Sequence, residues 1–156
     1  MIVSDATVLI TLININALEV LSLFTERIIL PPEVYEEVTY RPSAKSVIDQ
    51  EIERGFMRVK KYENHTIFNE LNYILDAGES AAMTLAIEKK LPLIIDEKKG
   101  RSIARRQGIE IVGLVGILRF LYMENRLERE KVLEIVDRLN RSDFRVSEAL
   151  LALIVS

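Results

Sequence analysis

Leu93-Ile94-Ile95-Asp96 is a short apolar run that ends in an acid, and Met1-Ile2-Val3-Ser4-Asp5 has the same form at the start of the chain. Each run is short and aliphatic, as a buried strand is, and each is followed by residues with helical spacing. Parallel strands need crossover connections, so strands that alternate with helices indicate a parallel sheet with helices on both faces. The two acids then lie at the carboxyl edge of the sheet, where such folds bind ligands.

The rest of the chain continues this alternation without repeats or a low-complexity linker. Further strands are expected at residues 27–30, 56–60 and 109–112. Helices are expected at residues 6–12, 18–24, from 32 onward, 43–54, 66–75, 78–90, 100–107, 113–123, 128–139 and 146–155, with Ser43 as the cap of the fourth. The pattern predicts one α/β domain that spans residues 1–156.

Composition excludes several kinds of chemistry. The 156 residues include no cysteine and one histidine, His65, so disulfides, thiolate zinc sites and two-histidine metal motifs are impossible, and any metal must be held by oxygen. His65 has no identifiable partner and is expected to be exposed or to cap a helix. The net charge of −3 argues against a broadly basic nucleic-acid surface, although it allows a local basic patch.

The ends of the chain carry no evident membrane or export signal. Residues 1–24 lack a basic start and contain Asp5 and Glu19, which an export signal would exclude. The apolar run 149–155 is shorter than the roughly 20 residues that cross a bilayer, and it is expected to form a buried terminal helix. We therefore expect a soluble, cytoplasmic protein without membrane contact.

Two further acids stand at positions that suit a site. Glu79 opens the helix that follows Gly78, and Glu37 lies nearer the buried stripe marked by Val34 and Val38 than Glu33 or Glu36 does. Each acid also has a structural interpretation. Asp5 and Asp96 can cap the helices that follow them, Glu79 can complement a helix dipole, and Glu37 can be a solvated charge.

Taken together, the four acids resemble the acidic quartet of the PIN-domain nucleases, and the resemblance covers nearly the whole chain. It rests on Ser4-Asp5-Ala6-Thr7, on Pro31-Pro32-Glu33-Val34-Tyr35-Glu36-Glu37-Val38, on Ala77-Gly78-Glu79-Ser80-Ala81-Ala82 and on Ile95-Asp96-Glu97-Lys98-Lys99-Gly100-Arg101. These segments look like a prokaryotic branch that is related to VapC-type toxins. The resemblance implies a three-layer α/β/α fold whose parallel strands have the order 3-2-1-4-5.

It also implies a catalytic set of Asp5, Glu37, Glu79 and Asp96. Of these, Asp5, Glu79 and Asp96 would hold Mg²⁺ or Mn²⁺, and the hydroxyl of Thr7 would position a metal-bound water. Oxygen ligands suit both ions, and magnesium takes only one or two carboxylates directly. The chain departs from the family where many relatives have a second aspartate. The nearby candidate is Glu97, whose side chain is expected to point away from that of Asp96.

RNA is the expected substrate. Lys98, Arg101 and Arg105 recur at i, i+3 and i+7, which places them on one helix face beside Asp96, and Lys99 extends the charge. A solvated helix face explains the same run equally well. A VapC-like protein would also have a small antitoxin partner, and the stripe of Leu150, Leu151 and Ile154 is core or part of a homodimer contact.

Three functions compete at this point. The first is a metal-dependent endoribonuclease that cleaves single-stranded or structured RNA, with the role of a toxin in a VapC-like setting. The second is an RNA-binding module without turnover, which the missing second aspartate favours. The third is a phosphorylation-dependent receiver domain, which also gathers acids at strand ends. The third is weaker because Asp5 lacks an adjacent acid and no lysine ends the strand at 109–112.

Overall fold

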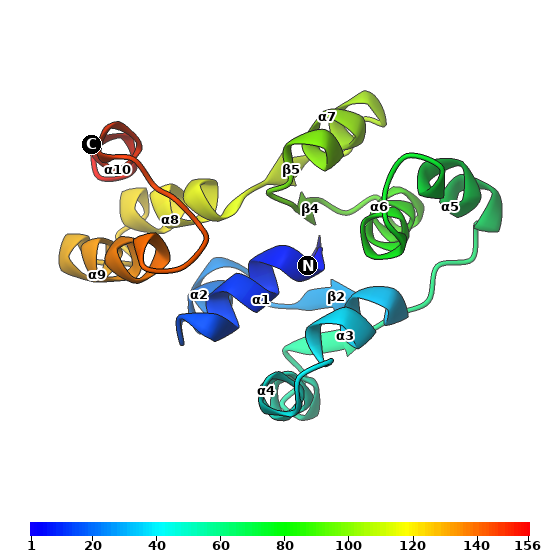
Figure 1. The fold of residues 1–156 in the computed structure, drawn as a ribbon, viewed down its shortest axis with the longest axis horizontal. Helices are drawn as coiled ribbons and strands as arrows, with labels where there is room; N and C mark the ends of the chain where they lie inside the picture. Colours follow the sequence, from blue (N-terminus) through cyan, green and yellow to red (C-terminus); the bar gives the residue numbers. More distant parts are fainter.

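Five short strands form a parallel sheet at the centre of the molecule, which we describe from a computed structural model of residues 1–156 (Figure 1). They are β1 (Ile2–Ser4), β2 (Ile28–Leu30), β3 (Met57–Val59), β4 (Leu93–Ile94) and β5 (Ile111–Val112). Their order is β3-β2-β1-β4-β5, and each neighbouring pair is parallel. The predicted α/β class and the order 3-2-1-4-5 are both confirmed.

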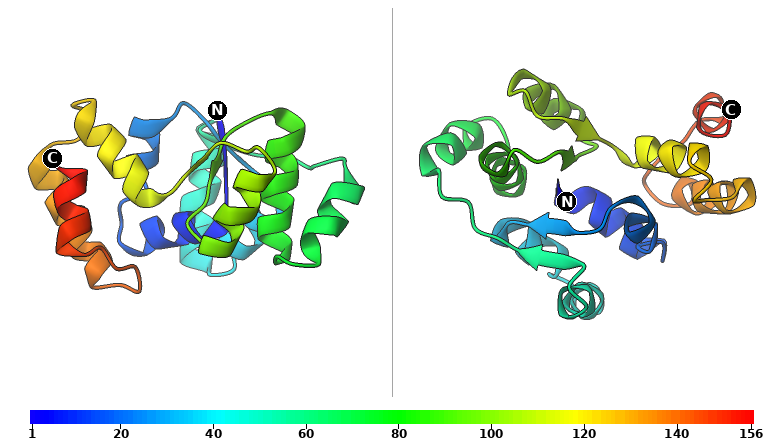
Figure 2. Two further views of the ribbon diagram at one scale, coloured as in Figure 1. Left: turned by 90° about the horizontal axis from the view of Figure 1, so that it is seen from above. Right: turned by 180° about the vertical axis from the view of Figure 1, so that it is seen from behind.

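Ten helices surround the sheet. They are α1 (Ala6–Asn14), α2 (Val20–Phe24), α3 (Pro32–Val38), α4 (Pro42–Glu53), α5 (His65–Asn72), α6 (Ala77–Lys89), α7 (Lys98–Arg106), α8 (Leu114–Met123), α9 (Arg129–Asn140) and α10 (Glu148–Ile154). Helices α5 and α6 lie on one side of the sheet, and α1, α2 and α8 lie on the other (Figures 1 and 2). The sheet is therefore covered on both faces, as the expected three layers require.

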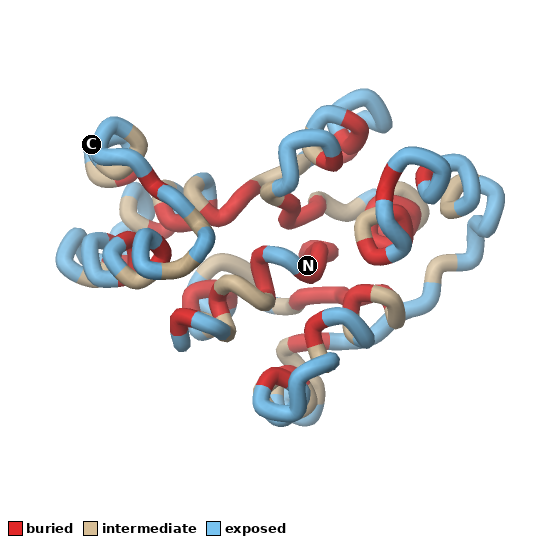
Figure 3. The backbone as a smooth tube through the Cα atoms, viewed as in Figure 1, coloured by how far each residue is buried: buried red, intermediate tan, exposed pale blue.

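The sheet is the centre of the hydrophobic core. All residues of β1, β2 and β4 are buried, and buried segments of α1, α6 and α8 surround them (Figure 3). A parallel strand that is covered on both faces needs apolar side chains at successive positions. This explains why Ile2-Val3 and Leu93-Ile94 are continuous apolar runs with no alternation.

Some predicted boundaries are wrong for local reasons. Ser43 does not cap α4, because Pro42 occupies the first helical position and Arg41, which makes no side-chain cap bond, precedes it. The last helix is shorter than residues 146–155, since the hydroxyl of Ser147 caps it by accepting a bond from the backbone N–H of Leu150. That helix is also less buried than expected, because Ile154 is its one buried residue.

The carboxyl edge of the sheet is where β1 passes into α1 and β4 leads to α7. In Figure 1, α1, α3, α6 and α7 are arranged around the end of β1. Helix α3 packs against both α1 and α6, so side chains from distant parts of the sequence meet at this edge. Elsewhere, no helix combines the length and apolar character needed to span a membrane.

Candidate active site

Asp5 stands between β1 and α1 and is almost fully buried. Its Oδ1 caps α1 by accepting a hydrogen bond from the backbone N–H of Val8, with 3.3 Å between the heavy atoms. Its Oδ2 is buried and has no partner. The pKa of this carboxyl is raised to about 7, mainly by burial and to a lesser extent by the charges of Asp96 and Glu37, while the backbone amides of Val8 and Asp96 oppose the rise. Capping therefore explains one oxygen and leaves the other free for a ligand.

Asp96 lies directly beyond β4, on the strand next to β1. It does not cap the helix that follows it, so that structural interpretation is wrong. Its Oδ2 instead accepts a bond of 3.1 Å from the backbone N–H of Leu114, the first residue of α8. Burial raises the pKa of Asp96, while the Leu114 amide and the nearby Arg101 guanidinium oppose that rise. The backbone amide at the start of α8 thus orients the carboxylate of Asp96, which follows β4.

Glu97 takes the capping role at α7. Its carboxylate accepts bonds from the backbone N–H groups of Lys99 (3.1 Å) and Gly100 (2.6 Å), and the Gly100 amide is the main reason that its pKa is lowered. The side chain leaves Asp96, as expected, but it turns toward Glu79. A Cβ placed on Gly100 would lie 2.9 Å from Glu79 Oε2 and 3.2 Å from Glu97 Oε2. Because Gly100 has no side chain, there is room for the carboxylates of Glu79 and Glu97 to approach each other.

Glu79 lies in the first turn of α6 and is half-buried. Its Oε2 is buried and, like Asp5 Oδ2, has no hydrogen-bond partner. The pKa of the Glu79 carboxyl is raised to about 8, mainly by burial and also by the nearby carboxylates of Asp76 and Glu97. The position of Glu79 in the first turn of α6 also places it where the helix dipole favours a negative charge.

Glu37 reaches the same region from α3. A Cβ on Gly78 at the start of α6 would lie 3.2 Å from Glu37 Oε1, and burial and then the charge of Asp76 raise the Glu37 pKa. The prediction that Glu37 is the inward-facing acid of α3 is only partly right. Glu37 remains exposed, whereas Glu33 is half-buried and accepts a bond from the hydroxyl of Tyr62.

Asp76 is an acid that the sequence reasoning did not select. Its Oδ1 caps α6 by accepting a bond of 2.8 Å from the backbone N–H of Glu79, and its charge acts on both Glu79 and Glu37. The spacing Asp76-Ala77-Gly78-Glu79 is that of a capping box, with an acid three residues after the cap. That signal was available in the sequence and would have placed the start of α6 one residue earlier.

The predicted RNA-binding residues occupy different positions around α7. Its buried side consists of Gly100, Ile103 and Ala104, and Lys98 and Arg105 are exposed on the opposite side. Arg101 is half-buried, and its charge acts on Asp96. The exposed Lys99 is a neighbour of Glu97. Arg101 is thus the basic residue of this group that lies next to a candidate catalytic acid.

Thr7 and His65 are both exposed. The Thr7 hydroxyl makes no hydrogen bond within the protein, so it is free to contact a water at the start of α1. His65 begins α5 but does not cap it, because the Asn64 side chain accepts the bond from the backbone N–H of Ile67. The His65 ring contacts the edge of Tyr62 with 5.4 Å between centroids, away from the acids.

The acids have the chemistry of a divalent cation site, although no three of them already stand at ligand spacing. Two buried carboxylate oxygens without partners, Asp5 Oδ2 and Glu79 Oε2, come from different elements of the carboxyl edge. Unpaired buried carboxylates are costly, and a hard cation with oxygen preference removes that cost. In its chemistry, the donor set therefore fits Mg²⁺ or Mn²⁺.

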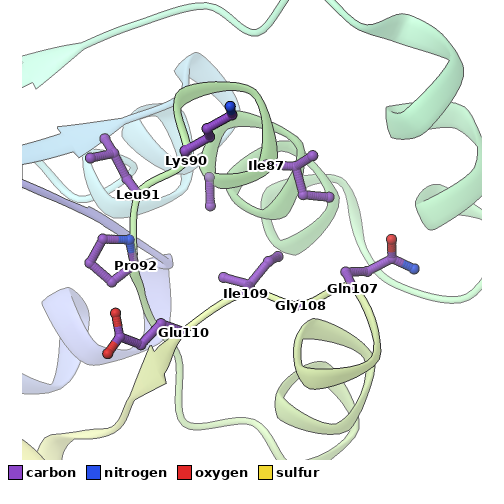
Figure 4. Close-up of a pocket in the computed structure, with 9 residues that line it drawn as sticks. Ile87, Lys90, Leu91, Pro92, Gln107, Gly108, Ile109 and Glu110 are labelled. Carbon is purple, nitrogen blue, oxygen red and sulfur yellow. The ribbon is translucent and has the colours of Figure 1, made fainter.

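One cavity of the molecule lies away from these acids, whereas a smaller one of about 80 Å³ is lined in part by Glu37. The pocket in Figure 4 has a volume of about 330 Å³ and is lined by Leu91, Pro92, Ile109 and Glu110 among others. These residues precede β4 and β5, so the pocket is at the amino edge of the sheet, opposite the acids.

Comparison with protein families gives a match along the whole chain. A family model described as a PIN domain matches residues 1–156. The comparison with curated proteins gives no match.

Proposed function

The chain belongs to the PIN-domain family, and from this premise we propose that it is a metal-dependent endoribonuclease that hydrolyses phosphodiester bonds of single-stranded or structured RNA. PIN domains are usually nucleases, which sets the reaction class. The observation that carries the proposal is the pair of buried, unpartnered oxygens Asp5 Oδ2 and Glu79 Oε2 at the carboxyl edge. A receiver domain is no longer an alternative.

In the proposed site, Asp5, Glu79 and Asp96 hold Mg²⁺ or Mn²⁺. The cation would polarise a phosphoryl oxygen and lower the pKa of a bound water. Asp96 is held for this role by the Leu114 amide, and Asp5 is held by the Val8 amide, so each keeps one oxygen for the ligand. Glu37 and Thr7 complete the proposed set, with Glu37 on the α3 side and the Thr7 hydroxyl beside the attacking water.

The proposed step is a hydrolysis. The oxygen of a water molecule forms a bond to phosphorus while the bond between phosphorus and one bridging ester oxygen breaks. A proton of that water passes to a neighbouring carboxylate, for which Glu37 is the accessible acceptor. The released ester oxygen takes up a proton and leaves as a hydroxyl group. Arg101, beside Asp96, is placed to contact the phosphate, and Lys98, Lys99 and Arg105 would attract the RNA at longer range.

The finer biological role follows the resemblance to VapC-type toxins. In that role the protein would act in the cytoplasm, would be restrained by a small antitoxin protein and could form a homodimer. Coexpression with a candidate antitoxin, followed by a growth assay and a size measurement of the purified complex, would test this role.

A second candidate function is RNA binding without turnover. It is favoured by the absence of a preformed set of three ligands and by the engagement of Glu97 in capping α7. The two functions differ in their need for a metal. Binding without turnover would persist in EDTA and would give no products with any ion.

The deciding experiment is cleavage of end-labelled single-stranded RNA with EDTA, Mg²⁺ or Mn²⁺. The native protein is compared with Asp5→Asn and Asp96→Asn, and with Asp143→Asn as a control for an exposed acid that belongs to no site. We expect metal-dependent products from the native protein and the control, and none from the two site variants. Cleavage that persists in both site variants would refute the proposed mechanism.

A further inference from the structure

A polar cavity of about 410 Å³ lies between the start of α3 and the connection from β3 to α5, two segments that can be followed in Figure 1. Its volume is in the range of sites that bind small molecules. The proposed hydrolysis uses none of the side chains in its wall. These are Pro32, Glu33, Glu36, Lys61, Tyr62 and the only histidine of the chain, His65.

The sheet places this cavity at the same edge as the acids. Strands β1, β2 and β3 are parallel neighbours, so their carboxyl ends lie side by side. Asp5 is the first residue after β1, and Pro32 and Lys61 are each the second residue after β2 and β3. Neighbouring strands are about 4.8 Å apart. The cavity therefore begins one to two strand spacings from the strand that leads to Asp5.

Helix α3 is a second link between the cavity and the acids. Glu33 lines the cavity, and Glu37 is four residues further along the same helix. Side chains at this spacing are neighbours on a helix face, with about 5–6 Å between their Cβ atoms. The charge of Glu37 acts in turn on Asp5. The cavity is thus one helical turn from a proposed catalytic acid.

The side chains of the cavity combine a fixed ring with free polar groups. The hydroxyl of Tyr62 donates a bond of 3.0 Å to Glu33, and the Tyr62 ring stacks on Phe68 with 4.8 Å between centroids. These two contacts fix the ring. Glu36 and Lys61, in contrast, are exposed and make no hydrogen bond or ion pair within the protein. One carboxylate and one ammonium are therefore available to a ligand beside an ordered aromatic ring.

Guanine is the base whose edge matches a carboxylate beside an ammonium. A carboxylate only accepts hydrogen bonds, through two oxygens, and an ammonium only donates them. The Watson–Crick edge of guanine has two adjacent donors, N1–H and the N2 amino group, next to the acceptor O6. Adenine, cytosine and uracil each have an acceptor beside their donor, which would face the second carboxylate oxygen. Unpaired RNA bases are recognised on this edge, with their faces stacked on tyrosine or histidine.

We propose that this cavity binds a guanine base of the RNA close to the cleaved bond. The carboxylate of Glu36 accepts from N1–H and from the N2 amino group, the ammonium of Lys61 donates to O6, and the Tyr62 ring contacts the face of the base. This inference rests on the proposed nuclease function, to which it adds a preference for sequence. The residues of the cavity position the RNA and take no part in the bond-breaking step.

The first test is binding of free mononucleotides in EDTA, which does not depend on cleavage. Because His65 is the only histidine, the proton on its Cε1 gives a single NMR signal that reports on the cavity. We expect GMP to shift this signal until it saturates. AMP, CMP and UMP carry the same phosphate and sugar and should shift it much less. Glu36→Gln should lose the preference for GMP, and Glu53→Gln, which changes an exposed glutamate of α4, should keep it.

The second test is cleavage in Mn²⁺ of end-labelled RNAs made of uridine with one central guanosine, adenosine, cytidine or inosine. We expect cuts at a fixed distance from guanosine, at a rate about 5- to 150-fold above that of the adenosine and cytidine RNAs, the range for one bidentate base contact. Inosine lacks the N2 amino group and should give an intermediate rate. In Glu36→Gln the ratio of the guanosine rate to the adenosine rate should fall toward one, whereas Glu53→Gln should keep the native ratio.

The outcomes separate this inference from the nuclease function. Cleavage of RNA without a preference for guanosine would overturn the inference and leave the nuclease function intact. GMP that binds no better than AMP, or a preference for guanosine that survives in Glu36→Gln, would also overturn the inference. A protein that binds GMP through Glu36 but cleaves no RNA with any ion would refute the nuclease function and retain the cavity as a guanine site.

Discussion

Gly113 lies against the carboxylate of Asp96 so closely that a Cβ on residue 113 would overlap Asp96 Oδ1. The two residues are 17 positions apart, and the backbone N–H of the next residue, Leu114, donates to the other carboxylate oxygen. The start of α8 thus holds Asp96 from both sides. A glycine is required there for space, since the φ of −103° would allow any residue.

Gly113→Ala is expected to displace Asp96 and to lower RNA cleavage by about 100-fold, the scale of a displacement of about 1 Å in a catalytic group. The matched control is Gly116→Ala in the same helix, where the new Cβ would stand 3.0 Å from Val112 and away from the acids. Cleavage rates in Mn²⁺ and unfolding curves of both variants measure the effect. Equal activity of the two variants at equal stability would show that Asp96 does not need this support.

Asp5→Asn is expected to stabilise the metal-free protein above pH 7. The pKa of Asp5 is raised from 3.8 to about 7 in the folded protein, so the folded chain binds more protons than the unfolded chain between these values. The free energy of unfolding then falls as pH rises from about 4 to 7. Asparagine can still cap the helix but has no charge to bury, so the stability of Asp5→Asn should not fall with pH in this way. By pH 8 the free energies of unfolding of the two proteins should differ by roughly 2–4 kcal/mol.

Urea unfolding in EDTA at several pH values between 4 and 8 measures this difference. Asp143→Asn is the control, because that exposed acid shows no such burial. A difference in the free energy of unfolding between the native protein and Asp5→Asn that stays constant from pH 4 to pH 8 would contradict the prediction. In saturating Mn²⁺ at pH 8, the native protein should become more stable than Asp5→Asn, because the cation stabilises only the protein that binds it.

Cation binding is expected to strengthen steeply between about pH 6 and pH 8.5. Protons compete with the cation for the carboxylates, and the pKa values of Asp5 and Glu79 are raised to about 7 and about 8. Below these values each group is mostly protonated, so affinity is low; above them both are charged. The affinity for Mn²⁺ at each pH is measured directly by a titration that is followed by electron paramagnetic resonance. The variant Asp5→Asn/Glu79→Gln should bind weakly with little dependence on pH, and a flat native profile would contradict the assignment.

Arg101→Ala is expected to weaken binding of single-stranded RNA and to reduce the slope of log affinity against log salt by about 0.7, the value for one phosphate contact. Arg101 is the half-buried cation beside Asp96. Arg141→Ala is the control, because Arg141 is an exposed arginine at the C-terminal end of α9, paired with Asp137. An unchanged slope would show that Arg101 does not contact a phosphate and acts only on Asp96.

The strands were largely predictable from their spacing, and their order was implied by the resemblance to the PIN-domain nucleases, but the partners of the acids were not predictable. Helical and strand spacing located nearly every element, since it reflects burial on one face or on both. The capping of α7 by Glu97 and the bond from Leu114 to Asp96 depend on backbone directions that a linear pattern does not contain. Asp76 is the exception, because the capping-box spacing with Glu79 is local and could have been recognised.

By itself, the sequence determined that any metal must be bound by oxygen, that the chain alternates strands with helices, and that Asp5 and Asp96 follow buried strands. These are local properties, set by residue type and by the period of burial. Only the tertiary structure decided which carboxylate oxygens are left without partners, that Glu97 turns to Glu79, and that Gly113 makes room for Asp96. Those relationships join residues far apart in the chain, and they are settled by how the helices pack around the edge of the sheet.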